Sequence, residues 1–249
     1  MMRFWRERSL ARPGLFDIEL MKLLKGRPLS GELRCLYAIG CHRFEEKALI
    51  EEIFPNLRHI VLFEPLPEPL VHLRAMAATD SRVRIVPCAI GASDGKAEFH
   101  VTTNDGESSS LLPLGKHQEV FPWVAESRSM SVDVRKLGSV VREQSIPPPD
   151  LLIVDVQGAE YDVIASIDED LLRNVRLIYT EVSTEPLYVG GRPLADVEAL
   201  LQPSFRNVGF VPLMPNALMH GNAVFVRHDD SDRLMEPGVI SRFGSWIRG

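Results

Sequence analysis

"LLIVDVQGAEYDVIASI", residues 151–167, places a short apolar run directly before two acids and a glycine. The run Leu151–Val154 has the length and composition of a strand buried on both faces. Asp155 follows at once, and Gly158 and Glu160 come shortly after it. An uncompensated buried carboxylate costs several kcal/mol, so a purely structural strand has no use for one at its end. The stretch therefore predicts a strand that ends at the rim of a ligand crevice.

Strand-like and helix-like segments alternate on both sides of this stretch. The strand-like segments are 33–39, 58–64, 82–90, 151–154 and 175–182, and the helix-like segments are 44–54, 68–78, 159–172 and 193–202. A turn with an antiparallel strand at 91–102, a polar loop at 103–129, a strand at 130–137 and a closing hairpin, "FRNVGFVPL" with "NAVFVRH", complete the pattern. Such alternation predicts an α/β fold with a mainly parallel sheet, helices on both faces and an antiparallel hairpin at its edge.

Three regions are expected along the chain. Residues 1–33 form an N-terminal helical extension, because "LFDIELMKLLKG" places apolar residues near one helical face and ends at Gly26. Residues 34–228 form the main domain, and 229–249 form a charged C-terminal tail of no legible function. A chain of 249 residues fits one large α/β domain better than two ordinary ones.

Composition narrows the possible partners. The chain is 45% hydrophobic and 25% charged, and its net charge of −6 disfavours a nucleic-acid partner, which clustered Lys and Arg would have to bind. No apolar run approaches the roughly 20 residues that span a bilayer, and no signal-peptide core follows the basic N-terminus. We therefore expect no integral membrane segment and a cytoplasmic protein.

Metal and disulfide chemistry are not expected either. The three cysteines have no CxxC spacing, and the seven histidines are scattered without an HExxH motif. Acids that hold a metal and so orient a diol substrate are the less favoured alternative.

Three of the five expected parallel strands have an acidic residue at their carboxyl end: Glu64, Asp155 and Glu181. Ligands of open α/β sheets bind at the carboxyl ends of the strands. Three acids at one rim therefore predict that a polar or cationic ligand occupies the space between them.

Glu64 follows the second strand, somewhat more than twenty residues after Gly40, where a carboxylate can bind the two hydroxyls of a ribose. The alternative is a surface glutamate before the turn "EPLPEP". Gly40 allows a tight turn, but "AIGCHRF" is neither GxGxxG nor GxxxxGK[ST], so a phosphate-bearing cofactor is not expected. A nicotinamide enzyme or a kinase is thereby disfavoured, whereas a nucleoside cofactor without phosphates is not.

Asp155 can face the reactive end of such a cofactor, or it can simply form a strand-end turn. Glu160 has an equally simple role as an acid in a first helical turn. His42, in the loop after the first strand, is either a base or ligand contact, or a packing or surface residue. The stretch "YVGGRP", residues 188–193, is a flexible loop or a lid that presents Arg192 to an anionic group.

Several stretches, in this order, resemble the FkbM-type methyltransferases: "VLFEP", "VPCAIGASDGKAEF", "SSSLLP", "PDLLIVDVQGAEYDVI", "LIYTEVS" and "GNAVFVR". The resemblance covers about residues 34–228. It implies a Rossmann-like seven-stranded methyltransferase sheet, S-adenosylmethionine as cofactor, and methylation of a hydroxyl on a sugar, polyketide or other small metabolite. The element D-x-x-G-A-E at 155–160, with "FEP" upstream, is its most specific part.

The resemblance also implies roles for individual residues. In the cofactor-binding group, the amino-acid portion of S-adenosylmethionine would lie against Ile39, Gly40 and Cys41, and its ribose against Glu64 and Pro65. The adenine would lie near Cys88 and Ala89. Ser110 would contact the cofactor from a covering loop, and Asp155 would lie at the methyl group. Catalysis falls to Asp155 as general base, with Glu181 on the substrate side. The bland alternative for "ESSSL" is a solvated loop.

The first loop departs from the family pattern of an acid, a glycine, Ala-Asn and a second glycine. Ala38 stands where the acid is expected, His42 replaces the asparagine, and Phe44 replaces the second glycine, which should narrow the floor of the pocket. Leu137-Gly138 also stands where leucine-aspartate is usual. Two functions therefore stay open: an S-adenosylmethionine-dependent O-methyltransferase acting on a small-molecule or glycan substrate, or a non-catalytic binding or scaffold module with a degenerate cofactor loop.

Overall fold

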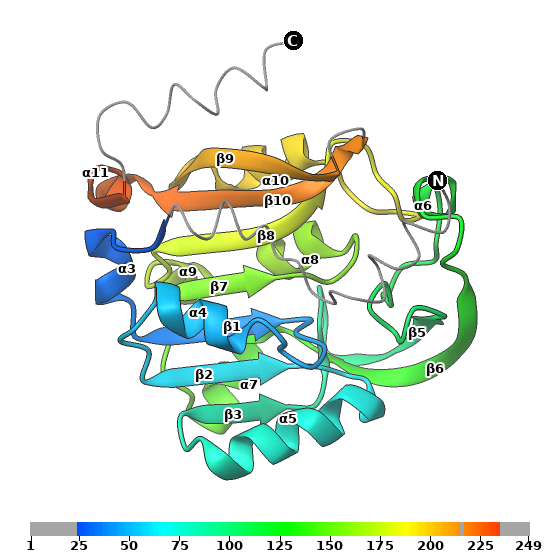
Figure 1. Ribbon diagram of the computed structural model, residues 1–249, viewed down its shortest axis with the longest axis horizontal. Coiled ribbons are helices and arrows are strands. Elements are labelled where there is room, and N and C mark those ends of the chain that lie inside the picture. The colour runs from blue at the N-terminus through cyan, green and yellow to red at the C-terminus, as the bar shows by residue number, and fades with distance from the viewer. Residues whose placement is uncertain (1–23, 215–216, 235–249) are drawn as a thin grey trace.

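The computed structural model describes residues 24–214 and 217–234, and the side chains of 214–219 are not described. Its main element is a seven-stranded sheet (Figure 1). In spatial order its strands are β3 (Val83–Val86), β2 (His59–Phe63), β1 (Cys35–Ile39), β7 (Leu151–Val154), β8 (Leu177–Ser183), β10 (Ala217–Arg227) and β9 (Phe205–Met214).

The first five strands in that order pair in parallel, whereas β10 pairs antiparallel with both β8 and β9. The predicted fold class is confirmed, including the C-terminal hairpin. Since β1, β2 and β7 are parallel and adjacent, Ile39, Phe63 and Val154 end at the same edge of the sheet. That edge is where the sequence places the acids.

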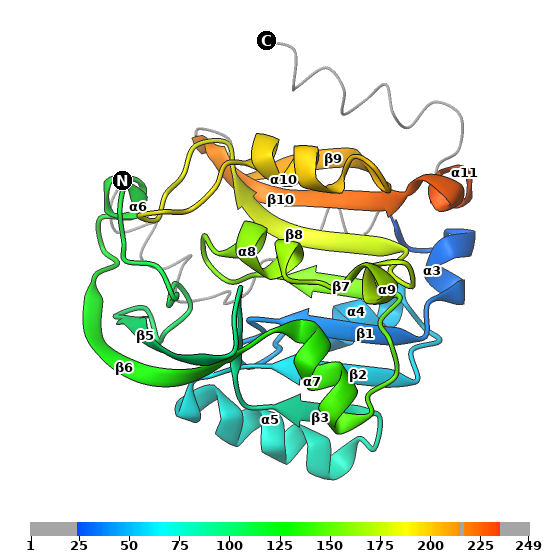
Figure 2. The ribbon, with the colours of Figure 1, turned by 180° about the vertical axis from the view of Figure 1, so that it is seen from behind.

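Helices cover both faces of the sheet (Figures 1 and 2). One face carries α3 (Pro28–Glu32), α4 (Lys47–Ile53) and α5 (Pro67–Thr79), and the other carries α7 (Leu137–Gln144), α8 (Glu160–Ala165), α9 (Glu169–Leu172) and α10 (Leu194–Leu201). Strand β1 shows how the cores separate: Tyr37 and Ile39 belong to the second face, while Leu36 and Ala38 belong to the first. Alternate residues of a buried strand point to opposite faces, and both are apolar here.

The region expected as an appended extension contributes to this core. Leu24, Leu29 and Leu33 are almost fully buried in the cluster beneath α3, α4 and α5. The remainder of the predicted extension, 1–23, lies outside the described residues. At the other end, the 3₁₀ helix η1 (His228–Asp230) and α11 (Ser231–Leu234) follow β10, and 235–249 again lie outside them.

A second, three-stranded sheet corrects the expectation of one strand over 82–90. The segment divides into β3 and β4 (Ala89–Ile90), and β4 joins β6 (Glu126–Arg135) and β5 (Gly95–Thr102) in the order β4-β6-β5. Pro87 lies between the two pieces. It has no N–H to continue the ladder, and the Cys88 amide instead donates to the Val86 carbonyl at 2.9 Å.

Two other expectations need correction. The single helix over 159–172 is divided into α8 and α9, where the Ser166 hydroxyl donates to the Val163 carbonyl and ends the first helix. The loop over 103–129 contains α6 (His117–Val120) and the first residues of β6.

Candidate active site

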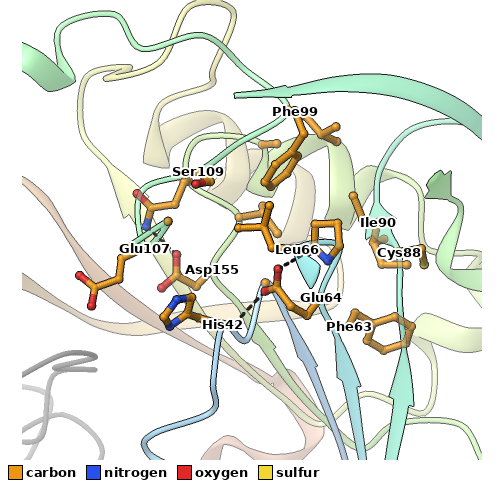
Figure 3. A pocket seen from close by; sticks show the side chains of 18 residues that line it. His42, Phe63, Glu64, Leu66, Cys88, Ile90, Phe99, Glu107, Ser109 and Asp155 are labelled. Atoms are coloured by element: carbon orange, nitrogen blue, oxygen red, sulfur yellow. Dashed lines mark hydrogen bonds between the residues drawn. The ribbon is translucent and has the colours of Figure 1, made fainter. Parts of the chain in front are cut away.

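A pocket lies at the carboxyl ends of β1, β2 and β7, between the main sheet and the second sheet (Figure 3). One part of its wall is apolar and comprises Cys88, Ala89, Ile90, Phe99 and Leu111. The other part is polar and comprises His42, Glu64, Glu107, Asp155 and Gln157. The pocket can therefore receive a ligand with one apolar end and one polar or charged end.

Gly40 lets the chain turn beneath this pocket. Its φ of 76° lies in the left-handed region, and a Cβ there would lie 1.8 Å from the carbonyl oxygen of Asp155. The Gly40 and Cys41 amides both donate to the Phe63 carbonyl, at 3.0 and 3.3 Å. A glycine is thus required where the ends of β1, β2 and β7 come together.

Glu64 is buried at the end of β2 and faces the pocket (Figure 3). Its carboxylate accepts the His42 amide at 2.9 Å and the Leu66 amide at 2.8 Å, one on each oxygen. Burial raises the pKa of Glu64 to about 7, although these two amides oppose the shift. Each carboxylate oxygen retains a lone pair for a ligand hydroxyl, so Glu64 can bind a vicinal diol.

The loop after Gly40 keeps the backbone that glycine and asparagine favour. His42 has a φ of 45° and Phe44 a φ of 56°. The expectation that Phe44 narrows the floor of the pocket is wrong, because its ring is buried in the core beneath α3, α4 and α5 and does not line the pocket. The unusual side chain occupies the core, and the turn itself is retained.

His42 lines the pocket and joins two loops. Its Nδ1 lies 3.2 Å from Oε1 of Glu45, and its Nε2 lies 3.1 Å from the Asp105 carbonyl oxygen. Burial acts to lower the pKa of His42, but the hydrogen bond and charge of Glu45 outweigh it, so the pKa is raised. The imidazolium would bring positive charge to a wall that is otherwise acidic.

Four residues of the element at 155–160 have distinct positions in the site. Asp155 is half-buried and lines the pocket, and its Oδ1 accepts Nε2 of Gln157 at 2.7 Å. Gly158, at φ 99°, leaves room for the Tyr188 ring, which a Cβ would approach to 2.7 Å. Glu160 opens α8 and accepts the Gly158 and Val156 amides at 2.9 and 3.2 Å, so its role is structural.

Glu181 is buried behind Asp155 and is connected to it through Gln157, whose Nε2 donates to both acids. Its Oε1 lies 3.3 Å from Nε2 of His220, and Nδ1 of His220 lies 2.9 Å from the Ser183 hydroxyl. Burial acts to raise the pKa of Glu181, but the charge of His220 outweighs it and the pKa is lowered. Glu181 is therefore the ionised member of this pair of acids.

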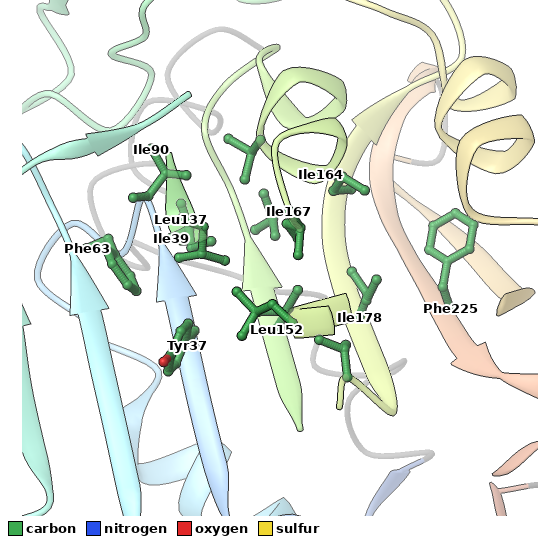
Figure 4. Close-up of a cluster of buried hydrophobic side chains, with 14 of the residues drawn as sticks. Tyr37, Ile39, Phe63, Ile90, Leu137, Leu152, Ile164, Ile167, Ile178 and Phe225 are labelled. Atoms are coloured by element: carbon green, nitrogen blue, oxygen red, sulfur yellow. The ribbon is translucent and has the colours of Figure 1, made fainter. Parts of the chain in front are cut away.

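Three expected cofactor residues are close by but do not line the pocket. Ile39 is buried in the core under α7 and α8 (Figure 4), and Cys41 is buried in the opposite core. The Ser110 hydroxyl donates to the Val156 carbonyl at 3.3 Å. A contact between the cofactor and Ile39, Cys41 or Ser110 stays a prediction. By contrast, Gly40, Glu64, Pro65, Cys88, Ala89 and Asp155 all line the pocket.

The serine stretch is buried, so its interpretation as a solvated loop is wrong. Ser108, Ser109 and Ser110 are each less than a tenth exposed. Ser109 lines the pocket, and its hydroxyl accepts the Thr102 amide at 3.1 Å. The loop covers the pocket from the side of the second sheet.

Aromatic rings that the sequence did not single out continue outward from His220. Phe121 lies 6.0 Å from the His220 ring and 5.8 Å from Trp123, and His117 lies between Phe121 and Tyr188. Trp123 is 53% exposed, whereas Tyr188 is buried and donates its hydroxyl to Oε1 of Gln157 at 2.7 Å. These rings connect the acid pair to the surface.

The "YVGGRP" stretch is more than a free loop. Tyr188 is locked beside Gly158, and the Val189 amide donates to the Pro113 carbonyl at 3.0 Å. Arg192 lies over the Tyr161 ring at 5.3 Å and pairs with Asp196. Its role as a lid stays a prediction.

Neither a cluster of candidate metal ligands nor a membrane-spanning helix is present in the part of the chain that the structure describes. The described ranges, 24–214 and 217–234, contain no group of three or more His, Cys, Asp or Glu side chains suited to a metal ion. Within the same ranges, no helix combines the length and apolar character that crossing a bilayer requires.

The sheet order is that of the Rossmann-like methyltransferase fold. The chain belongs to the FkbM methyltransferase family, since residues 49–212 match the family model described as the methyltransferase FkbM domain.

Similar proteins agree with this placement. The 2-O-methyltransferase NoeI of Sinorhizobium fredii (strain NBRC 101917 / NGR234) is 33% identical over 180 residues, which are 70% of this chain and 73% of that protein. Methyltransferase sdnD of Sordaria araneosa is 31% identical over 166 residues, 57% of this chain and 62% of that protein.

Among solved structures, methyltransferase FkbM from Methylobacillus flagellatus KT matches with a TM-score of 0.51 at 15% identity. The match covers 84% of this chain but half the length of that one, and it shows the shared fold.

Proposed function

We propose that this protein is an S-adenosylmethionine-dependent methyltransferase that methylates a hydroxyl of a small molecule. The observation that carries the proposal is that Glu64 and Asp155 line the same pocket, together with the turn at Gly40. Glu64 suits a ribose, and the apolar part of the wall at Cys88, Ala89, Ile90 and Phe99 suits an adenine. The acids at the polar end suit a sulfonium and an ammonium group.

The described residues fit this cofactor without a phosphate site. Glu64 would hold the ribose hydroxyls, and the turn at Gly40 with His42 would lie along the amino-acid portion. When bound, the cofactor would supply a methyl group on a positively charged sulfur, ready for transfer to a nucleophile. Holding donor and acceptor in near-attack geometry supplies much of the rate in such reactions.

Asp155 would act as the general base, because it is the acid of the pair that faces the pocket. Glu181 and His220 lie behind it and set its environment. The acceptor would approach from the side of Phe121 and Trp123, where an exposed aromatic ring continues from this buried group.

The acceptor is a hydroxyl on a sugar, polyketide or other small metabolite. The name of NoeI, a 2-O-methyltransferase, supports oxygen as the methyl acceptor. Action in the cytoplasm, without a nucleic-acid partner, completes the proposal.

The competing hypothesis is a non-catalytic module, which the altered sequence of the loop after β1 suggests. The structure gives this hypothesis less support, because His42 and Phe44 keep the left-handed backbone of the turn and the Phe44 ring does not line the pocket.

Calorimetric titration with S-adenosylhomocysteine and S-adenosylmethionine tests the proposal. We expect dissociation constants of about 10 µM or tighter. Glu64→Gln keeps the shape of the side chain but loses its charge, and it should weaken binding by roughly tenfold, as expected for hydrogen bonds to a charged group. Glu68→Gln is the matched control, because Glu68 is exposed in α5 and pairs with Arg128. Failure of the wild-type protein to bind either ligand at about 1 mM would favour the module.

A further inference from the structure

Asp155 and Glu181 are held close together by one side-chain amide. Nε2 of Gln157 donates to Oδ1 of Asp155 and to Oε2 of Glu181. Two carboxylates that share one donor in a largely buried site do not both ionise unless a positive charge compensates each of them. With only the described side chains around it, the pair retains one proton.

The surroundings decide which acid holds that proton. Glu181 has a counter-ion in His220, whose Nε2 lies 3.3 Å from Oε1. His220 is 6% exposed, and its other nitrogen lies 2.9 Å from the Ser183 hydroxyl, so its ring is fixed. Asp155 has no comparable cation against it among the described residues, and the proton therefore rests on Asp155.

The pKa shifts point the same way. Burial raises the pKa of Asp155 well above its usual range, and the charge of Glu181 adds to the shift. The pKa of His220 is raised, since Glu181 outweighs its burial. Burial lowers the pKa of His117 to about 4, with His220 adding to the effect, so His117 is neutral near pH 7.

The other ionisable groups around Asp155 do not supply a positive charge that would stabilise its carboxylate. Glu160 accepts the amides of its own loop, and Tyr188 stays protonated because burial raises its pKa. Across the pocket are Glu64, Glu107 and His42, but both ring nitrogens of His42 already have partners in Glu45 and Asp105.

We propose that Asp155 is protonated in the empty pocket and loses this proton when the positively charged sulfur of the cofactor binds. Glu181 and His220 are the positioning residues that keep the proton on Asp155 rather than on Glu181. This inference rests on the proposed function. Asp155 releases its proton when a sulfonium enters the pocket, because the cation stabilises the carboxylate. Methyl transfer then forms an oxygen–carbon bond, breaks a sulfur–carbon bond, and delivers the hydroxyl proton to Asp155.

The local charge is thereby balanced at every stage. A neutral carboxyl accompanies a neutral thioether, and a carboxylate accompanies a sulfonium. The substrate cofactor, but not its demethylated product, should therefore be bound with release of a proton from Asp155.

Calorimetry in two buffers measures this directly without an acceptor. Phosphate and Tris differ widely in ionisation enthalpy, so the difference in observed binding enthalpy counts the protons released. At pH 7 we expect S-adenosylmethionine to release about one proton more than S-adenosylhomocysteine. Sinefungin, which carries an ammonium group in place of the sulfonium, should resemble S-adenosylmethionine.

Asp155→Asn is the decisive variant, because it keeps the size of the side chain and removes the proton. The excess release should vanish in Asp155→Asn and persist in the surface control Glu68→Gln. This comparison cancels protons that come from the ligands' own amino groups.

His220→Gln tests the positioning residues. Without its counter-ion, Glu181 should compete for the proton, so the pH at which S-adenosylmethionine releases it should rise. A merely structural role for His220 would weaken both ligands equally and leave that pH unchanged.

The outcomes separate the two proposals. Binding of both ligands with equal proton release in the wild-type protein would overturn the inference and leave the methyltransferase proposal standing. Absence of binding by either ligand would overturn the proposed function, and the inference with it.

Discussion

Phe44 occupies a backbone position that glycine adopts more easily, yet its ring is nearly fully buried in the core beneath α3, α4 and α5. Positive φ in a bulky residue costs of order 1 kcal/mol. Burial of an aromatic ring repays that cost, since removing one from a core typically costs about 3–5 kcal/mol. The departure from the family pattern is therefore a change in packing.

Phe44→Gly separates packing from binding. We expect the free energy of unfolding to fall by about 2–4 kcal/mol, the loss of ring burial less the relief of positive φ. Urea denaturation measures the loss. The affinity of the folded protein for S-adenosylhomocysteine should stay the same, and Phe44→Leu should lose less stability. A several-fold gain in affinity on removing the ring would mean that Phe44 does restrict the pocket.

Single residues were predictable from the sequence where one local rule applied. Glu64 and Asp155 follow strands directly, and the carboxyl ends of parallel strands lie at one edge. Gln157 was not singled out, because only the fold brings Tyr188 and Glu181 to it. His220 was one of several scattered histidines, and its place comes from the antiparallel register that sets it opposite Ser183.

Elements were predictable where their periodicity was regular, and their interruptions were not. The helices α4, α5 and α10 lie within a few residues of their expected bounds. The division at Pro87 depends on the second sheet, to which β4 belongs through pairing of Ala89 with Val134. No pattern within 82–90 reveals a partner more than forty residues away.

Arg176 connects three elements outside the site. Its guanidinium, 23% exposed, donates to Asp230 in η1 and to Glu32 in α3, both at 2.9 Å, from the residue before β8. Asp230 is only 6% exposed, so losing its partner would leave a buried carboxylate poorly compensated.

Arg176→Met should accordingly lower the free energy of unfolding by roughly 3 kcal/mol. Arg173→Met is the matched control, because Arg173 is 61% exposed and its pairs with Glu169 and Asp170 lie on the surface. The control should cost less than about 0.5 kcal/mol. Equal losses in the two variants, measured by urea denaturation, would contradict a role for Arg176 in holding α3 and η1 to the sheet.

At the scale of the whole molecule, buried acids dominate the pH dependence of stability. Burial raises the pKa of Glu46 to about 8 and the pKa values of Glu64 and Glu160 to about 7, and it raises that of Asp155 as well. Between its unfolded and folded pKa, such an acid is protonated in the folded chain and ionised in the unfolded one. The free energy of unfolding therefore falls as pH rises through that interval.

The histidines mostly act in the same direction. His42 and His220 have raised pKa values, so the stability they contribute is present below about pH 6.5 and is lost as pH rises through their folded pKa. His117, with its lowered pKa, opposes the trend only below about pH 6.5.

We therefore expect the ligand-free protein to melt at a lower temperature at pH 8 than at pH 6.5, by at least about 4 °C for a chain of this size. Differential scanning calorimetry across that interval measures the change. Melting temperatures that are constant or rise with pH would show that these acids are ionised in the folded protein.

The layered arrangement follows from the alternation of segments, and both cores form because alternate residues of the parallel strands are apolar. The floor and the cover of the pocket were predictable to different degrees. Its floor belongs to the main sheet, whereas its cover is built by β4, β5 and the buried serine loop, which only the assembled second sheet brings into place.

A crystal structure of the protein with S-adenosylhomocysteine tests the central claim most directly. We expect both ribose hydroxyls within about 2.6–3.2 Å of the Glu64 carboxylate, the adenine against Cys88 and Phe99, and the sulfur on the side of Asp155. A ligand bound elsewhere, or one whose ribose points away from Glu64, would contradict the account.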